Sequence, residues 1–551
     1  MNAPEKKSGV ITAVAAKTTC NGADVLCDTL LANDVDVCFA NPGTSEMHFV
    51  AALDRKPRMR CVLGLFEGVV TGAADGYARM ADKPAATLLH LGPGLANGLA
   101  NLHNARRAGT PMVNIVGDHA THHLAFDAPL TSDIESLARP MSHWVQRVEK
   151  AGDVSRAAAQ AVREARAAPG RIATLILHAD AAWTDLPAAP RIEVAARSSP
   201  AAPAAARLDT AAAALRSGRP AVILLTGRAL RAGALETASR IAQATGARLL
   251  AQQSNARLER GAGRVAIDRV PYPVDQALAC FAGVEHLLLI GAKAPVAFFA
   301  YPGKPSSMLP PGCQVIEAAR ADEDLASALE QLADRLALPR DLTLLVSPRV
   351  RTEVPSGALK PSAIFRAVAA CLPEGAIVCD ESVSSGRDAF PATYGAAPHD
   401  HLQLTGGAIG DGMPMAVGAA IACPDRKVVC LQADGSGMYT VQALWTMARE
   451  RLDVVVIVFA NRRYAILHNE LKAVGAGGVG YTAGHNASRM LDLVDPALDW
   501  VALAKGMGVE GASTDDAARF SDLLRTAMSR PGPFLIEARI CAGWLRLTLR
   551  R

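Results

Sequence analysis

The segment "QADGSGMYTVQALWTMARERLDVVVIVFANRR", residues 432–463, places an aspartate and an asparagine 27 positions apart. A strand is expected over residues 427–432, a turn at "ADGSG", and a helix over residues 438–452. The β-branched run over residues 453–460 predicts a second buried strand, which ends at Asn461. Strand, helix and strand in this order predict two neighbouring parallel strands, so Asp434 and Asn461 would meet at one carboxyl edge of a sheet.

The two side chains suit a particular kind of ligand. A carboxylate and an amide oxygen are typical donors to a hard cation such as Mg²⁺, which takes few protein ligands and several phosphate oxygens. Gly435 and Ser436, at the expected helix start, have backbone N–H groups that would suit an anion. The spacing alone leaves a second explanation open, in which Asp434 caps a helix and Asn461 ends a strand.

Composition excludes several classes of protein. The chain has 551 residues, half of them apolar, so it can bury several cores. Its net charge is +4 and it has no run of basic residues, which argues against a nucleic-acid partner. No apolar stretch reaches the roughly 18–20 residues of a membrane span. Its 11 cysteines include no CxxC pair, which argues against a disulfide framework or a zinc site and favours the cytoplasm.

The rest of the chain repeats the same alternation of strand and helix. Short apolar runs such as "AATLLHL" and "PMVNIVGD" alternate with helical patterns such as "GVVTGAADGYARMA" in the first 190 residues. A Pro- and Ala-rich segment over residues 186–209 is typical of a linker. A second and a third block of the same kind follow. This pattern predicts an α/β fold with parallel sheets covered by helices.

At this point the residues carry a resemblance. "ADGS" followed by Asn461 resembles the motif of thiamine-diphosphate-dependent enzymes, a Gly-Asp-Gly with one or two asparagines nearly thirty positions later. In that family the aspartate, the final asparagine and a backbone carbonyl two residues further bind Mg²⁺, which implies Asp434, Asn461 and the Arg463 carbonyl. Ala433 and Ala460 depart from the motif, but neither replaces a metal-ligating side chain.

A second stretch, "FEGVVTGAADGYAR" over residues 66–79, resembles the family segment that carries an invariant glutamate. The resemblance implies that Glu67 bonds to N1′ of the aminopyrimidine and promotes removal of the thiazolium C2 proton. The resulting ylid is the nucleophile and later the electron sink. Taken alone, an acid at a helix start is explained by the helix dipole.

Two further stretches complete the implied cofactor site. In "LTGGAIGDG" the resemblance implies that the bulky Ile409 wedges the cofactor into its bent shape, while Gly407 and Ile409 hold the pyrimidine by their backbones. "ESVSS", residues 381–385, resembles the loop whose hydroxyls touch the diphosphate, with Ser384 as the main candidate. An ordinary tight turn also explains "GGAIG".

The resemblance covers roughly residues 20–540 and implies three flavodoxin-like (Rossmann-like) domains. These are a pyrimidine-binding domain over residues 20–190, a central domain over residues 208–345 and a diphosphate-binding domain over residues 358–545. Since Glu67 and Asp434 serve one cofactor from different domains and relatives build each site between two subunits, a homodimer or homotetramer is implied.

Two members of the family compete. Residues 41–53 and 88–105 resemble both benzoylformate decarboxylase and the large subunit of acetolactate synthase; Asn41, Pro42 and Gly43 open the first stretch and are implied as cofactor contacts. The Gly-Pro-Gly at residues 92–94 is closer to the synthase. His90, however, matches a proton-transferring histidine of the decarboxylase. The place of that enzyme's second histidine is taken by Phe298.

Other histidines offer a substitute for the missing one. His122 and His123 resemble the adjacent histidines of pyruvate decarboxylase and are candidates for acid–base catalysis. Together with His119 they also suggest a metal site or, alternatively, a surface loop without a role. His468 is a further candidate.

The resemblance implies a Mg²⁺- and thiamine-diphosphate-dependent decarboxylase of a 2-oxo acid, acting through the C2 ylid and an enamine-carbanion. Alternatives are an acetolactate-synthase-like carboligase that joins two 2-oxo acids and, more remotely, a non-catalytic scaffold that keeps the cofactor. Some relatives hold FAD in the central domain, but no flavin pattern supports it here.

Overall fold

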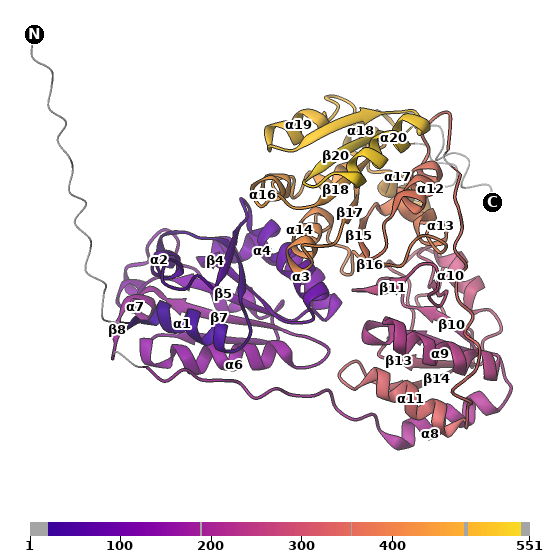
Figure 1. Ribbon diagram of the computed structural model, residues 1–551, viewed down its shortest axis with the longest axis horizontal. Helices are drawn as coiled ribbons and strands as arrows, with labels where there is room; N and C mark the ends of the chain where they lie inside the picture. Colours follow the sequence, from indigo (N-terminus) through magenta and orange to yellow (C-terminus); the bar gives the residue numbers. More distant parts are fainter. Residues whose placement is uncertain (1–19, 188–189, 354, 479–482, 541–551) are drawn as a thin grey trace, which may run out of the picture.

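Three sheets, parallel except at one edge of the C-terminal one, organise the chain in the computed structural model, which confirms the predicted α/β class. The structure describes residues 20–187, 190–353, 355–478 and 483–540. Residues 541–545 of the predicted third domain therefore lie outside it. In Figure 1 the N-terminal part lies on the left, the central part at the lower right and the C-terminal part at the upper right.

The N-terminal sheet is entirely parallel, with the strand order β3-β2-β4-β5-β7-β6. Its strands are β2 (Val37–Asn41), β3 (Arg60–Leu63), β4 (Ala85–His90), β5 (Met112–Asp118), β6 (Trp144–Val148) and β7 (Ile172–His178). A two-stranded antiparallel ribbon, β1 (Cys20–Asn21) with β8 (Asp185–Leu186), joins the two ends of this part.

The central sheet is also parallel, in the order β12-β10-β9-β13-β14. Its strands are β9 (Ala221–Leu225), β10 (Arg248–Ala251), β12 (Asp268–Arg269), β13 (His286–Ile290) and β14 (Gln314–Ala319). One central segment, β11 (Leu258–Arg260), leaves this sheet and pairs antiparallel with β16 of the C-terminal sheet. Sheet membership therefore does not follow the order of the chain at this point.

The C-terminal sheet has the order β11-β16-β15-β17-β18-β20-β19. Its remaining strands are β15 (Ala376–Glu381), β16 (His399–Gln403), β17 (Val428–Ala433), β18 (Val454–Ala460), β19 (Glu510–Thr514) and β20 (Phe534–Arg539). β17 and β18 are parallel neighbours, as predicted, and Ala433 pairs with Phe459. Asp434 and Asn461 therefore follow adjacent strands at the same edge.

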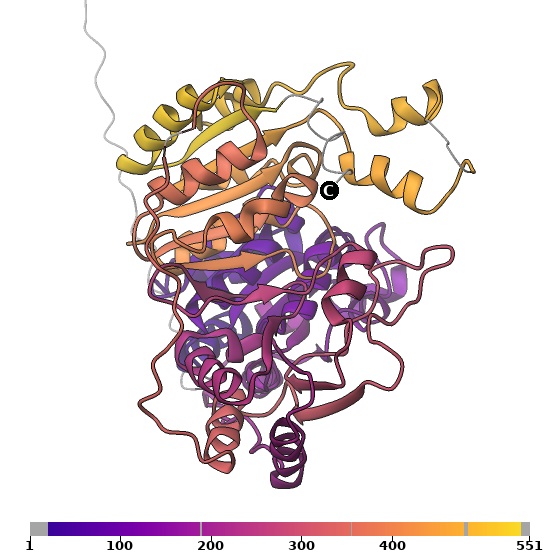
Figure 2. The ribbon, with the colours of Figure 1, turned by 90° about the vertical axis from the view of Figure 1, so that its right-hand side faces the viewer.

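The helices cover the faces of the three sheets (Figure 1). They are α1 (Gly22–Ala32), α2 (Met47–Leu53), α3 (Glu67–Ala81), α4 (Leu91–Ala108), α5 (Ile134–Ala138), α6 (Val154–Arg166), α7 (Ala179–Trp183), α8 (Ala205–Arg216), α9 (Ala232–Thr245), α10 (Val274–Phe281), α11 (Leu325–Arg335), α12 (Pro361–Cys371), α13 (Ala389–Ala392), α14 (Gly412–Ala422), α15 (Asp434–Gly437), α16 (Ala443–Arg449), α17 (Ala465–Ala473), α18 (His485–Leu491), α19 (Trp500–Gly506) and α20 (Ala517–Ser529). α17 and α18 project from the rest of the C-terminal part (Figure 2).

The prediction of a single helix over residues 438–452 is wrong. Two short helices, α15 and α16, flank a turn at residues 438–442 instead. The turn places Thr440 so that its hydroxyl donates to the Gly410 carbonyl at 2.9 Å. Residues 438–442 form this turn and a contact to a distant loop instead of continuing a helix.

α3 and α14 pack so closely that their backbones touch. A Cβ on Gly76 would overlap the Met415 carbonyl, and a Cβ on Gly418 would overlap the Ala73 carbonyl. One hydrophobic core runs across this contact and joins the N-terminal and C-terminal parts. Glycine is required here because any side chain would push the helices apart.

Buried charges reinforce the same contact. Arg79 of α3 is paired with Asp75 and donates to the Gln403 carbonyl at 2.7 Å. Asp411 lies 3.9 Å from Arg79, and neither of its carboxyl oxygens has a hydrogen-bond partner among the described residues. Burial, aided by nearby Asp75, raises the pKa of Asp411 well above its usual range, so its neutral form is favoured.

Two sequence-based exclusions can be compared with the structure. None of the described helices is both long and apolar enough to cross a membrane. The cysteines at the described positions are all free, as their sequence pattern predicts.

The α3–α14 contact predicts the effect of one methyl group. Gly418→Ala should lower the free energy of unfolding by about 1–3 kcal/mol, because the added Cβ meets backbone rather than a movable side chain. Gly233→Ala is the matched control, since its helix leaves open space around that position; it should stabilise by about 0.4–1 kcal/mol. Urea unfolding measures both, and equal values for the two variants would contradict the packing argument.

Candidate functional site

Asp434 and the 461–463 loop meet at the carboxyl edge of β17 and β18. The Asp434 carboxylate accepts hydrogen bonds from the backbone N–H groups of Gly435 (2.9 Å) and Arg462 (2.6 Å). The Asn461 side-chain oxygen accepts from the N–H of Arg463 at 3.0 Å, and the Arg463 carbonyl accepts from Ala465 at 3.0 Å. Burial raises the pKa of Asp434 to about 6, and no cationic side chain among the described residues pairs with this carboxylate.

The turn after β17 carries two more predicted residues. Gly435 and Ser436 are buried in the one-turn helix α15. The ring of Tyr464 packs where a Gly435 side chain would be. Ser436 accepts a hydrogen bond from the side-chain amide of Gln432 at 2.7 Å and donates to the Ala433 carbonyl at 3.2 Å. The turn is thereby fixed with its N–H groups at the sheet edge.

The loop between β16 and α14 lies beside this turn. Gly407 has a positive φ of 80°, which favours glycine, and a Cβ there would lie 2.8 Å from the ring of Phe298. Phe298 therefore lies against the loop predicted to hold the pyrimidine. Ile409 is half-buried, and next to it Gly410 is held by Thr440. Ser384 lies half-buried in a 3-10 turn (Val383–Asp388) after β15, the next strand of the sheet.

Glu67 begins α3, as the motif predicts. It is only 8% exposed, and its carboxylate accepts a hydrogen bond from the side-chain amide of Asn97 at 3.0 Å. The other oxygen faces Gly94, where an added Cβ would lie 3.2 Å away.

His90 ends β4 and is oriented by an acid that the sequence did not single out. Its Nδ1 lies 2.8 Å from Glu46 Oε2, and the same oxygen accepts from the Gly43 N–H at 2.7 Å. The Ser45 hydroxyl donates to the other oxygen of Glu46 at 2.9 Å. Asn41, Pro42 and Gly43 form the half-buried end of β2 and the turn after it, and the His90 ring packs against Gly43.

Glu67 and His90 flank one small space. A Cβ added to Gly94 would lie 3.2 Å from a Glu67 carboxyl oxygen and 3.4 Å from the Cβ of His90. The Glu67 carboxylate and the base of the His90 side chain therefore both lie next to Gly94, where β4 meets α4.

Asparagines of α4 connect the two groups of predicted residues. Asn101 donates to the carbonyls of Gly68, beside Glu67, and Gly410, beside Ile409, at 2.8 and 3.1 Å. Asn104 donates to the Ala408 carbonyl at 2.7 Å and accepts from its N–H at 3.2 Å. These hydrogen bonds thus join the start of α3 to the loop between β16 and α14.

His122 and His123 lie apart from this arrangement. Both are exposed in a 3-10 segment (Thr121–Phe126), where their rings approach Trp183 (6.4 Å) and His119 (5.5 Å), respectively. Within the described part of the chain, no hydrogen bond or ring contact joins them to His90 or Glu67. That part also contains no cluster of three His, Cys, Asp or Glu side chains suited to a metal, so the alternative of a histidine metal site is not supported.

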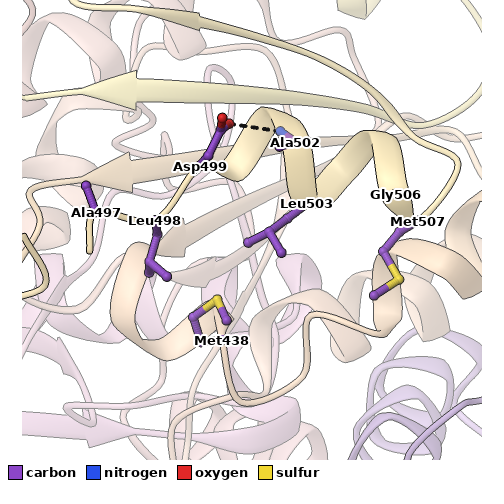
Figure 3. A pocket seen from close by; sticks show the side chains of 8 residues that line it. All are labelled: Met438, Ala497, Leu498, Asp499, Ala502, Leu503, Gly506 and Met507. Atoms are coloured by element: carbon purple, nitrogen blue, oxygen red, sulfur yellow. Dashed lines mark hydrogen bonds between the residues drawn. The ribbon is translucent and has the colours of Figure 1, made fainter. Parts of the chain in front are cut away.

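An open groove of about 450 Å³ lies between Met438, which follows α15, and the residues at and around α19 (Figure 3). Figure 3 shows mostly apolar side chains around it, and Asp499 caps α19 through the N–H of Ala502 at 2.9 Å. Its lining residues are Met438, Ala497, Leu498, Asp499, Ala502, Leu503, Gly506 and Met507. None of them is a predicted site residue, so the groove is separate from the carboxyl-edge site.

Several functional neighbours were not predicted. Glu46 and Asn97 hydrogen-bond to the predicted residues His90 and Glu67. Asn101 hydrogen-bonds to Gly68 and Gly410, which are next to predicted residues. The three asparagines of "NGLANLHNA" at positions 97, 101 and 104 recur at helical spacing on one face, which is a signal that the sequence did offer.

Comparison with known proteins gives matches over most of the chain. Residues 20–146 match the thiamine pyrophosphate enzyme N-terminal TPP binding domain, and residues 391–538 match the C-terminal TPP binding domain. A Mycobacterium tuberculosis chain provisionally named acetolactate synthase large subunit IlvX is 51% identical, over 94% of this chain and 98% of its own length. Benzoylformate decarboxylase of Pseudomonas aeruginosa is 30% identical, over 91% and 95%.

A solved structure gives the same indication. The thiamine diphosphate-dependent 4-hydroxybenzoylformate decarboxylase of Rhodococcus jostii RHA1 superposes with a TM-score of 0.79 at 27% identity, over 95% of this chain and 99% of its own.

Proposed function

Because the chain belongs to the thiamine pyrophosphate enzyme family, we propose that it is a Mg²⁺-dependent decarboxylase of a 2-oxo acid. The observation that carries the proposal is the His90–Glu46 pair, 2.8 Å apart, with the His90 Cβ and the Glu67 carboxylate both next to Gly94. A histidine held in this way is suited to proton delivery.

The predicted site residues at the carboxyl edges of the N-terminal and C-terminal sheets fit the cofactor. Asp434, Asn461 and the Arg463 carbonyl offer three hard oxygen donors, and none of the cationic side chains that the structure describes pairs with the buried Asp434 carboxylate. Ser384, Gly435 and Ser436 would hold the diphosphate, whereas Gly407, Ile409 and Glu67 would hold the aminopyrimidine. When bound, thiamine diphosphate supplies a nucleophilic carbon and an electron sink for the loss of CO₂.

The side chains of this protein then handle the protons. Glu67 would exchange a proton with the pyrimidine N1′, because its buried carboxyl has one oxygen free of the Asn97 bond. With both ring nitrogens protonated, His90 would direct its Nδ1–H to Glu46 and deliver the Nε2 proton to the reaction product. No described residue hydrogen-bonds to that Nε2, so it is available to a substrate.

A second candidate function is carboligation of two 2-oxo acids, as in acetolactate synthase. The Mycobacterium tuberculosis relative favours it by name. Phe298 also favours it, because an apolar ring beside Gly407 offers no proton to compete with a second oxo acid.

The proposal includes a homodimer or homotetramer. Two large apolar side chains next to site residues are exposed: Met47, after Glu46, at 44%, and Leu65, two residues before Glu67, at 46%. A second copy of the chain would cover them, and light scattering that gives a monomer at micromolar concentration would contradict this part of the proposal.

Replacing Asp434 tests the metal site. Asp434→Ala should weaken Mg²⁺-dependent binding of thiamine diphosphate by at least about tenfold, because a metal ligand is lost. Asp425→Ala, an exposed site before the other end of the same strand, is the control and should bind like the wild type. Isothermal titration calorimetry measures both, and normal affinity in a folded Asp434→Ala protein would reject the assignment.

Replacing His90 tests the reaction. In a panel of 2-oxo acids, His90→Ala should reduce aldehyde release by about 10²-fold or more while cofactor affinity changes little, and it should raise the share of ligated product. Glu46→Gln should shift the products in the same direction, because it weakens the bond that orients His90. If the wild type makes mainly acetolactate from pyruvate and His90→Ala leaves this unchanged, the synthase function replaces the decarboxylase.

A further inference from the structure

Glu381 is a buried acid to which the proposed mechanism assigns no role. It ends β15, is 1% exposed, and directs its carboxylate toward the loop that carries Ile409. The backbone N–H groups of Gly410 and Gly412 donate to its two oxygens at 2.6 and 2.5 Å. The side-chain amide of Gln432 donates to it at 3.1 Å.

These bonds connect three loops. Glu381 immediately precedes the loop of Ser384, Gly410 follows Ile409, and Gln432 lies two residues before Asp434 in the sequence. Gln432 also donates to Ser436 at 2.7 Å, so the contact continues into the turn predicted to hold the diphosphate. We propose that Glu381 is a positioning residue, which sets the loop of Ile409 relative to the diphosphate and metal loops; this inference rests on the proposed function.

The conformation of the Ile409 loop depends on hydrogen bonds from residues outside the loop. Gly410 has a positive φ of 98°, and a Cβ on Gly412 would lie 2.8 Å from the Glu381 side chain. Glycine at position 412 therefore lets the carboxylate reach the backbone. Two amides pointing at one carboxylate would otherwise be buried without a partner.

The opposite side of the loop is held by the N-terminal part. Asn101 and Asn104 of α4 bind the carbonyls of Gly410 and Ala408. Glu381 holds N–H groups and the asparagines hold carbonyls, so the loop is fixed between the two parts of the chain. Loss of the acid would let the backbone of Ile409 shift toward α4, and the cofactor carbon would lose its alignment with the proton acceptor.

Glu381→Gln is the informative variant because it keeps the shape but places an NH₂ group against backbone N–H donors. The readout is hydrogen–deuterium exchange at C2 of thiamine diphosphate bound at saturating cofactor and Mg²⁺. We expect exchange about tenfold slower or more, with weaker cofactor binding. Glu374→Gln, an exposed acid just before the same strand, is the matched control and should exchange like the wild type.

The outcomes separate the inference from the proposed function. A wild-type protein that binds no thiamine diphosphate, or does not exchange C2, would overturn the function itself. A wild type that exchanges, with Glu381→Gln exchanging equally fast, would overturn only the positioning role. A lower melting temperature with unchanged exchange would likewise leave Glu381 a structural role alone and overturn the inference.

A second variant decides the matter if Glu381→Gln does not fold. Glu381→Asp keeps the charge but is one methylene shorter, so it cannot reach both Gly410 and Gly412. Slower exchange at saturating cofactor in Glu381→Asp would support the positioning role, and exchange at the wild-type rate would overturn it.

Discussion

The backbone contact between α3 and α14 is the constraint on which the site depends. Gly76 and Gly418 let the two helices touch at carbonyl oxygens, and a single hydrophobic core crosses the contact. α3 begins with Glu67, and α14 begins directly after the loop of Ile409. Within one chain, the relative position of these two groups is therefore set by helix packing, which is stiff because protein interiors are close-packed.

Hydrogen bonds from buried polar groups further restrict the position of the Ile409 loop. Asn101, Asn104 and Glu381 hold the loop of Ile409 by its carbonyls and N–H groups, and Gln432 extends the network to Ser436. Because a buried polar atom without a partner is costly, each of these bonds also restricts the loop it joins. The same logic explains Glu46, whose carboxylate serves Gly43, Ser45 and His90 together.

The chemistry at the carboxyl edges combines two environments. Glu67 and His90 both lie next to Gly94 and are the proposed proton-transfer groups, whereas the apolar ring of Phe298 lies against Gly407. In the proposed reaction the first pair favours protonation of the product and the ring favours its capture by a second oxo acid. The choice between a decarboxylase and a synthase is therefore a competition between a held histidine and a second substrate.

By itself, the sequence determined the α/β class and the position of Asp434 and Asn461 after adjacent parallel strands, because strand and helix periodicities are local and parallel strands share a carboxyl edge. Motif resemblance added Glu67 and the loop of Ile409. Only the tertiary structure decided which side chains hold these residues. Glu46 binds a partner 44 positions away, Glu381 binds one 51 positions away and Asn101 binds one 309 positions away, without any local signature. The helix expected over residues 438–452 was broken for the same reason, since Thr440 bonds to a loop that only the folded chain brings near it.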